Sequence, residues 1–482
     1  MKFIVTAFLL VYSFCLHAQT LVSKTLIASY SKQQLDSLLT ARGIPIILFS
    51  TRFGVDAYKL IYQTLDYDSS AKLASGLLAV PKGVNCELML VNYSHGTTSV
   101  KEDVPTRLNG EGLVGLVAAS NGLVMCQPDY LGMGDSEWPH YYLHAFTHAM
   151  CNIDLLRAAR ESCADLGIAL NDKLYIGGYS QGGFSTMATH QYIETYFSSE
   201  FQVTKSFPGA GSYDMSGAMV DLMLSDVSYP SPAYLPFLTF TWNAIYNFFT
   251  DPSVYLKAPY DSTLPPLIDG THSIGYINGF MPDTPKLIFH QYMIDSFANN
   301  MNHPLRLALA ENDVFRWAPQ ADMLLIHCRG DRQVPIQNTR NAYNYFKAHS
   351  SAAIDTLDLG PTLSHGQCGQ SYLFYLKTYL DSILAGEPCI SGISQPSQPL
   401  AIDISPNPAT GRISFRLLQP VNADYEWRVY GTCGKVYMQG VMRHDEMKRQ
   451  PSISTESLQP GMYLLQIASR NDFRRERFVI VR

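Results

Sequence analysis

Strand-like apolar runs alternate with helix-length amphipathic segments through most of the chain. The strand-like runs are Tyr58–Asp66, Ala74–Val80, Leu88–Tyr93, Leu123–Gln127, Leu174–Ile176 and Asp355–Leu359. The helix-length segments are Glu111–Asn121, Tyr142–Leu166, Gly182–Phe197 and Gln370–Leu384. We expect the first two runs to pair as antiparallel strands. The succession of strand, loop and helix after them predicts a mostly parallel sheet with helices on both faces.

Polar, glycine-containing loops follow three of these predicted strands. They are SHGTT from Ser94, PDYLGMGDS from Pro128 and GYSQG from Gly178. The carboxyl ends of parallel strands meet at one edge of a sheet, where functional groups gather in open α/β folds. We therefore expect the three loops to surround a common site.

Ser180 lies in the sequence Gly-Tyr-Ser-Gln-Gly, which fits the pattern G-x-S-x-G. A glycine turn without chemistry would give the same letters, so the position between a strand and a helix is what favours a nucleophile. Glycines at 178 and 182 leave space where a Cβ would meet the adjacent strand or helix. Gln181 follows, and its backbone N–H lies at the start of the predicted helix, where the dipole favours a developing negative charge.

The stretch LYIGGYSQGGFST resembles the nucleophile elbow of the α/β-hydrolases. NYSHGTT, from Asn92 to Thr98, resembles the oxyanion loop of that family, in which His-Gly is followed by small residues. The resemblance implies that the backbone N–H of Gly96 or Thr97 is an oxyanion donor beside that of Gln181. It also implies that His95 is structural rather than the base. An ordinary glycine turn is the alternative interpretation of this loop.

Two later stretches resemble the rest of the family's triad, in the order Ser, Asp, His. LIHCRGDRQVP places Asp331 just after a strand, and LSHGQCG places His365 between a short strand and a last helix. Asp331 is therefore the candidate acid and His365 the candidate base. Asp355 and Asp358 are the next candidates for the acid.

The distances along the chain predict an inserted cap. Ser180 and Asp331 are 151 residues apart, too many for one strand–helix–strand step, whereas the 34 residues from Asp331 to His365 fit one. We place the cap at about residues 214–320, a segment rich in Tyr, Phe, Trp and Pro. Its aromatic residues either form the core of the cap or line an apolar acyl-binding tunnel. The candidates for the tunnel are Phe237, Phe240, Trp242, Phe248 and Phe249.

The elbow, the cap and the positions of acid and base together resemble the secretory lipase family, related to yeast lipase A, over about Thr20–Pro388. The resemblance implies a serine esterase or lipase that cleaves small-molecule or lipid esters without a cofactor or a metal ion. A serine peptidase of the same fold is the alternative, because triad geometry serves amides as well as esters. The apolar cap favours an acyl chain.

Both ends of the chain indicate export. Residues 1–18 have the features of a signal peptide, with a basic Lys2, an apolar stretch and a small residue at the expected cleavage site. A hydrolase domain is expected at 19–388, a Ser/Pro/Gly linker at 389–400 and a β-sandwich at 401–482. In the last segment, SPNP and PGMYLLQI resemble the sorting domain of type IX secretion cargo, which implies export through that machinery to the medium or the cell surface. An ordinary binding module is the alternative.

Charge and cysteine content narrow the function further. The 482 residues carry a net charge of −6, which gives no sign of nucleic-acid binding, and residues 401–482 alone carry +4. After the predicted signal peptide, no run of residues is long and apolar enough to span a bilayer. No cluster of cysteines or histidines suggests a metal site. Beyond Cys15, the cysteines are Cys86, Cys126, Cys151, Cys163, Cys328, Cys368, Cys389 and Cys433. We expect Cys86 and Cys126 to be buried thiols and allow a bridge between Cys328 and Cys368.

Overall fold

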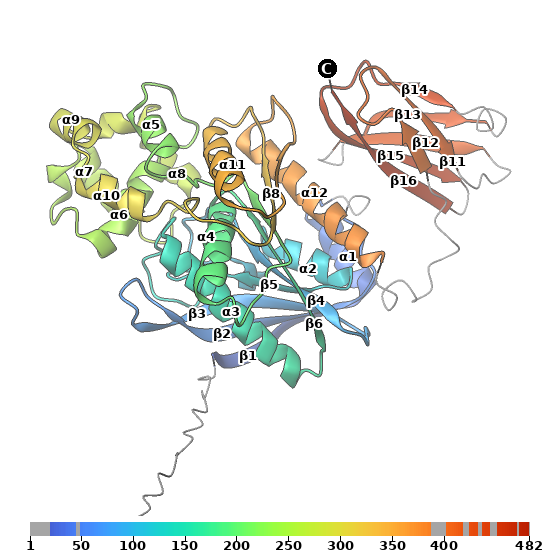
Figure 1. The fold of residues 1–482 in the computed structure, drawn as a ribbon, viewed down its shortest axis with the longest axis horizontal. Helices are drawn as coiled ribbons and strands as arrows, with labels where there is room; N and C mark the ends of the chain where they lie inside the picture. The colour runs from blue at the N-terminus through green and yellow to red at the C-terminus, as the bar shows by residue number, and fades with distance from the viewer. Residues whose placement is uncertain are drawn as a thin grey trace, which may run out of the picture.

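Two parts of different architecture make up the protein (Figure 1). The computed structural model describes residues 20–44, 49–386, 402–417, 424–431, 436–443, 451–469 and 472–481. The predicted signal peptide at 1–18 and the predicted linker at 389–400 lie outside these residues. The larger part is an α/β structure and the smaller, C-terminal part is built of strands only.

A nine-stranded sheet forms the centre of the larger part. Its strands are β1 (Leu21–Tyr30), β2 (Val55–Leu65), β3 (Ala71–Pro81), β4 (Leu88–Ser94), β5 (Val124–Pro128), β6 (Leu170–Tyr179), β7 (Lys205–Gly209), β8 (Asp322–His327) and β9 (Ile354–Asp358). Their order across the sheet is β1-β2-β3-β5-β4-β6-β7-β8-β9. β1, β2, β3 and β5 pair antiparallel in turn, and all other pairs are parallel. The predicted mostly parallel sheet is confirmed.

Helices cover both faces of this sheet (Figure 1). The helices are α1 (Lys32–Ala41), α2 (Gly112–Ser120), α3 (Ala145–Asp165), α4 (Gln181–Tyr196), α11 (Gln337–His349) and α12 (His365–Leu384). All seven residues of the central strand β4 are buried, as expected for a parallel strand between two helical layers. None of the helices in the described part of the chain is both long and apolar enough to cross a membrane.

Some element boundaries differ from the prediction. Helix α12 begins at His365 and not at Gln370, because Ser364 and Gln367 form a capping box that starts the helix earlier. Strand β7 was not predicted, since its sequence KSFPG is short and contains a proline and a glycine. Strand β1 and helix α1 were also missed; β1 lies at the sheet edge and only one of its ten residues is buried, so it lacks a clear apolar run.

A cap of short helices lies between β7 and β8. It contains α5 (Ala218–Leu224), α6 (Tyr234–Tyr246), α7 (Tyr260–Thr263), α8 (Ile274–Asn278), α9 (Gln291–Asn299) and α10 (Pro304–Glu311). Phe237 and Trp242 of α6 are fully buried in a core that the cap shares with α4 and α11. The indole Nε1–H of Trp242 donates to the carbonyl oxygen of Tyr142, 2.6 Å away. This contact fixes α6 close to the carboxyl ends of the central strands.

The C-terminal part is an all-β sandwich, as predicted. Its strands are β10 (Ile402–Ser405), β11 (Arg412–Leu417), β12 (Tyr425–Gly431), β13 (Val436–Met442), β14 (Ser452–Ser454), β15 (Gly461–Ser469) and β16 (Asp472–Ile480). They form a three-stranded sheet, β10-β11-β14, and a four-stranded sheet, β13-β12-β15-β16. Phe415 of the first sheet and Val429, Leu465 and Phe478 of the second share a buried core.

The cysteines follow the prediction only in part. Cys126, Cys151 and Cys163 are free and buried. Cys86 is disulfide-bonded, so the prediction of a buried thiol there was wrong; it precedes strand β4 and is partly exposed. Cys328 and Cys368 are bridged, and Cys389 and Cys433 lie outside the described residues.

Candidate active site

Ser180 lies in the turn between strand β6 and helix α4, in a strained backbone conformation. Its φ of 61° and ψ of −120° fall in a region that residues with a side chain rarely adopt. The turn has no room for side chains on its flanks. A Cβ at Gly178 would lie 2.5 Å from the carbonyl oxygens of Gly182 and Ser94, and one at Gly182 would lie 2.0 Å from that of Ser94. The two glycines therefore allow the sharp turn that exposes Ser180.

The three predicted triad residues form one chain of hydrogen bonds. His365 Nε2 is 2.8 Å from Ser180 Oγ, and His365 Nδ1 is 2.5 Å from Asp331 Oδ2. With a proton on Nδ1 donated to the carboxylate, Nε2 is free to accept the hydroxyl proton of Ser180. This is the arrangement that activates a serine nucleophile. Asp355 and Asp358, the alternatives for the acid, are exposed residues of strand β9.

Asp331 is held as a carboxylate by four contacts. The backbone N–H groups of Gln333 and Val334 donate to Oδ1 at 2.8 and 3.0 Å. His365 and His327 both face Oδ2, His327 with its Nε2 at 3.3 Å. Burial alone would raise the pKa of Asp331, but the hydrogen bonds from the two histidines outweigh it and hold the pKa well below its usual value. The acid therefore stays ionised in the site.

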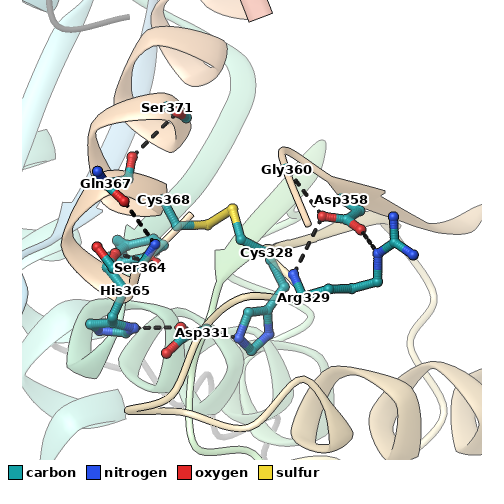
Figure 2. Close-up of a disulfide and its surroundings, with 12 residues drawn as sticks. Cys328, Arg329, Asp331, Asp358, Gly360, Ser364, His365, Gln367, Cys368 and Ser371 are labelled. Atoms are coloured by element: carbon teal, nitrogen blue, oxygen red, sulfur yellow. Dashed lines mark hydrogen bonds and ion pairs between the residues drawn. A yellow bond between two sulfur atoms is a disulfide. The ribbon is translucent and has the colours of Figure 1, made fainter. Parts of the chain in front are cut away.

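A disulfide ties the loop of the acid to the helix of the base (Figure 2). Cys328 lies three residues before Asp331, and Cys368 lies three residues after His365. Their Cα atoms are 6.0 Å apart, and both residues are fully buried. The bridge joins the end of β8 to the first turn of α12, so it limits the motion of Asp331 relative to His365. An ion pair between Arg329 and Asp358 joins β8 to β9 beside it (Figure 2).

The loop after β4 lies beside Ser180, but only one of its two predicted donors is available. The backbone N–H of Gly96 donates to Glu111 Oε1 at 3.0 Å, so it is already occupied. Within the described residues, neither the N–H of Thr97 nor that of Gln181 donates a hydrogen bond. Gln181 is the first residue of α4, so its N–H has no partner within the helix. Gln181 and Thr97 are therefore the better candidates for an oxyanion hole.

Buried histidines contact the Gln181 side chain and the loop after β4. The amide of Gln181 lies 2.6 Å from His140 Nε2, and His140 Nδ1 donates to the carbonyl oxygen of Leu131 at 2.9 Å. His95 Nδ1 lies 2.8 Å from the carbonyl oxygen of Gly96. Burial lowers the pKa of His95 and His148, and lowers the pKa of His140 and of His144 to about 4. All four are thus neutral at pH 7.

Sequence reasoning missed two polar residues of this site. Glu111 orients the oxyanion loop, and its only sequence signal is an acidic residue at the start of the apolar segment GLVGLVAAS. His327 contacts the acid and ends the apolar strand β8. No group of three or more His, Cys, Asp or Glu side chains in the described residues is arranged to hold a metal ion.

Solved structures of the same fold include proteins named for ester hydrolysis. A candidate hydrolase from Legionella pneumophila is 27% identical, with a TM-score of 0.70 over 76% of this chain and 99% of that chain. The rice cell wall degrading esterase LipA from Xanthomonas oryzae is 26% identical, with a TM-score of 0.66 over 77% of this chain and 98% of that chain. Candida antarctica lipase A, at 12% identity and a TM-score of 0.52 over 77% and 83%, shares the fold. The large domain has the α/β-hydrolase fold.

A family model matches the C-terminal sandwich. Residues 403–481 match the model of the secretion system C-terminal sorting domain, as the SPNP and PGMYLLQI motifs led us to expect. No curated protein sequence matches the chain. The hydrolase relatives and the sorting domain together support a secreted hydrolase.

A cavity of about 60 Å³ opens beside Ser180 and His365 of the hydrolase. Its walls are mostly apolar and include Tyr142, Leu143, Met215, Met219, Leu222, Met223, Tyr229, Tyr234, Leu235 and Leu238. None of the five aromatic residues expected to line a tunnel is among its described lining residues. Phe237 and Trp242 pack in the core of the cap instead. Composition revealed an apolar cap but not which side chains face the cavity.

A second apolar cavity lies next to the first one, within the cap. It measures about 40 Å³ and is lined by residues of the cap, among them Phe289, Met293 and Phe297. Met223 and Leu235 line both cavities. These two side chains therefore form the partition between the space at Ser180 and the interior of the cap.

Replacing both bridged cysteines by serine, Cys328→Ser with Cys368→Ser, tests the tie between acid and base. The bridge closes a sequence separation of 40 residues, for which the chain-entropy model gives about 4 kcal/mol of stabilisation. We expect a lower free energy of unfolding in urea and a lower kcat at temperatures where the variant is still folded. A variant with unchanged kcat and stability would show that packing alone holds the two loops. The buried free thiol Cys151, replaced by serine, is the control for cysteine loss without bridge loss.

The buried histidines predict a loss of stability in acid. In the unfolded chain an imidazole binds a proton below about pH 6.5, but His140 and His144 in the folded protein do so only near pH 4. Between these values the unfolded state holds more protons, so stability falls as the pH falls, by about 1.4 kcal/mol per pH unit for each histidine. Urea unfolding from pH 7 to pH 4 measures this slope. His140→Gln should flatten it, whereas the exposed His349→Gln should not; an unchanged slope in His140→Gln would contradict the argument.

Proposed function

We propose that this protein is a secreted serine esterase that hydrolyses acyl esters. The observation that carries the proposal is the apolar cavity that opens at the Ser180–His365 hydrogen bond. No Asp or Glu is among its described lining residues, so it offers no carboxylate for the amino group of a peptide. The esterase and lipase among the proteins of similar structure support the same choice. Export begins with the signal peptide at 1–18 and ends with type IX secretion through the C-terminal domain.

The mechanism follows from the contacts of the three residues. Ser180 Oγ attacks the ester carbonyl while His365 Nε2 takes its proton, and the ionised Asp331 stabilises the resulting imidazolium. The backbone N–H groups of Gln181 and Thr97 stabilise the oxyanion, with the α4 N-terminus adding its dipole. His365 then gives its proton to the leaving alcohol, which leaves an acyl group on Ser180. Water then attacks this acyl-enzyme while His365 takes its proton, and His365 returns that proton to Ser180 Oγ as the carboxylic acid product leaves.

The cavity supports a preference for short acyl groups. Its volume of about 60 Å³ is small compared with ligand pockets of about 300 Å³ or more. Met223 and Leu235 separate it from the further apolar space in the cap. A longer chain fits only if these side chains move, and methionine is the more flexible of the two. We therefore expect acyl length to be limited by how far Met223 and Leu235 can move, with Met223 the first to give way to a longer chain.

Substitutions of the triad test the reaction. Ser180→Ala and His365→Ala should lower kcat by roughly 10³- to 10⁶-fold, and Asp331→Asn by about 10³- to 10⁴-fold, with the fold intact by circular dichroism. Asp358→Asn is the matched control, because this carboxylate is exposed and pairs with Arg329. Hydrolysis of p-nitrophenyl acetate and butyrate provides the assay. Near-normal turnover by a folded Asp331→Asn variant would mean that the acid lies elsewhere.

Acyl-chain selectivity tests the substrate class and the partition. In the wild type, kcat/KM for p-nitrophenyl esters should rise about fourfold per methylene, the equivalent of about 0.8 kcal/mol, and level off early in the series. Met223→Ala should move this limit to longer chains by joining the two cavities. Phe240→Ala, which alters the cap away from the cavity, should affect all lengths alike. Efficient cleavage of di- and tripeptide amides together with weak, flat ester activity would favour the peptidase alternative.

A further inference from the structure

His327, the last residue of β8, is a second histidine beside the carboxylate of Asp331. Its side chain is 1% exposed. Nε2 lies 3.3 Å from Asp331 Oδ2 and 3.0 Å from the carbonyl oxygen of Val334. Nδ1 lies 2.7 Å from Thr339 Oγ1 on helix α11. One carboxylate oxygen therefore faces two imidazoles, and the mechanism above uses only that of His365.

The neighbours of His327 determine where its proton lies. Nε2 faces two groups that can only accept, a backbone carbonyl and an ionised carboxylate, so it carries a hydrogen. That hydrogen is shared between Val334 and Asp331. On its other side, Nδ1 faces the hydroxyl of Thr339, which holds the ring in place. The ring is therefore a rigid donor aimed at the acid.

This donor acts on the atom that also receives the hydrogen bond from His365. Asp331 Oδ1 is occupied by two backbone N–H groups, so His327 supplies the remaining contact that stops the carboxylate from turning. A carboxylate fixed in this way keeps Oδ2 in line with His365 Nδ1, and small displacements at such a contact reduce catalysis strongly.

We propose that His327 is a positioning residue, which acts through Asp331 to align His365 for the reaction assigned above. The proposal rests on the proposed serine hydrolase function. A purely structural role is the competing explanation: His327 would then only join the loop after β8 to helix α11, through Val334 and Thr339. The two roles differ in what they change, since a structural tie affects stability and an aligned donor affects the Asp331–His365 hydrogen bond itself.

Two amide replacements of His327 separate these roles. In His327→Gln the amide N–H can occupy the place of the Nε2–H and still donate to Asp331. In His327→Asn the amide reaches only as far as Nδ1 and can contact Thr339, but not the carboxylate. We expect His327→Asn to lower kcat by about 10- to 100-fold at nearly unchanged KM, as loss of comparable supporting contacts does. His327→Gln should retain most of the wild-type kcat.

The low-field proton NMR signal of the His365 Nδ1–H provides a readout that does not depend on turnover. It is assigned by its loss in His365→Ala and should shift or broaden in His327→Asn but not in His327→Gln. When Asp331→Asn is already present, adding His327→Asn should lower kcat only slightly further, because both changes break the same contact. Melting temperatures of all variants show how much of any effect is loss of fold.

Two results would overturn the proposal. One is wild-type kcat and an unchanged low-field signal in His327→Asn. The other is an equal loss of kcat and melting temperature in both replacements with the signal unchanged, which would establish the structural role. Failure of the proposed function has a different signature: the wild type would cleave no ester in the panel, while the NMR signal would still report whether His327 holds Asp331.

Discussion

The close approach of the Ser180 turn to the end of strand β4 is the constraint on which the site depends. β4 and β6 are neighbouring parallel strands, with Ser94 opposite Gly178. A Cβ at Gly182 would lie only 2.0 Å from the Ser94 carbonyl oxygen, so any larger residue would force the two strand ends apart. Their closeness places Gln181 and the loop that contains Thr97, the two proposed oxyanion donors, beside each other next to Ser180. An oxyanion hole requires such fixed and convergent donors.

Asp331 and His365, the proposed acid and base, are held together by other contacts, because Asp331 lies in the loop after β8 and His365 at the start of α12. Asp331 is a buried carboxylate, which is costly unless it is fully hydrogen-bonded. Two backbone N–H groups and two histidines meet that need. The disulfide from Cys328 to Cys368 then limits how far the loops can separate. Such a covalent tie suits an exported protein, because disulfides persist in oxidising surroundings.

The fold class could be predicted from the sequence, and so could three candidate residues, Ser180, Asp331 and His365, which the structure brings within hydrogen-bond distance, because both depend on local patterns. Apolar runs indicate buried strands, and the glycines around Ser180 indicate a turn that only glycine permits. The partners of these residues could not be predicted in the same way. Glu111 occupies the Gly96 N–H, and His327 faces Asp331, through contacts that exist only once the loops have folded. The direction of a backbone N–H, and hence the choice between Gly96 and Thr97, is decided by such a contact.

The composition of the cap did not predict which of its residues line the cavity. The residues that do line it suggest how selectivity arises. Its aromatic residues Phe237 and Trp242 were candidates for a tunnel wall, yet they pack in a rigid core with 0% exposure. The wall of the cavity instead contains three methionines, Met215, Met219 and Met223. Aromatic packing fixes the position of the cap, whereas unbranched methionine side chains adapt to what they contact. In the esterase proposed above, a rigid cap over a cavity with an adaptable wall would exclude water from Ser180 while a few side chains set the length limit. Acyl preference would then change by substitution of those side chains without altering Ser180, Asp331 or His365.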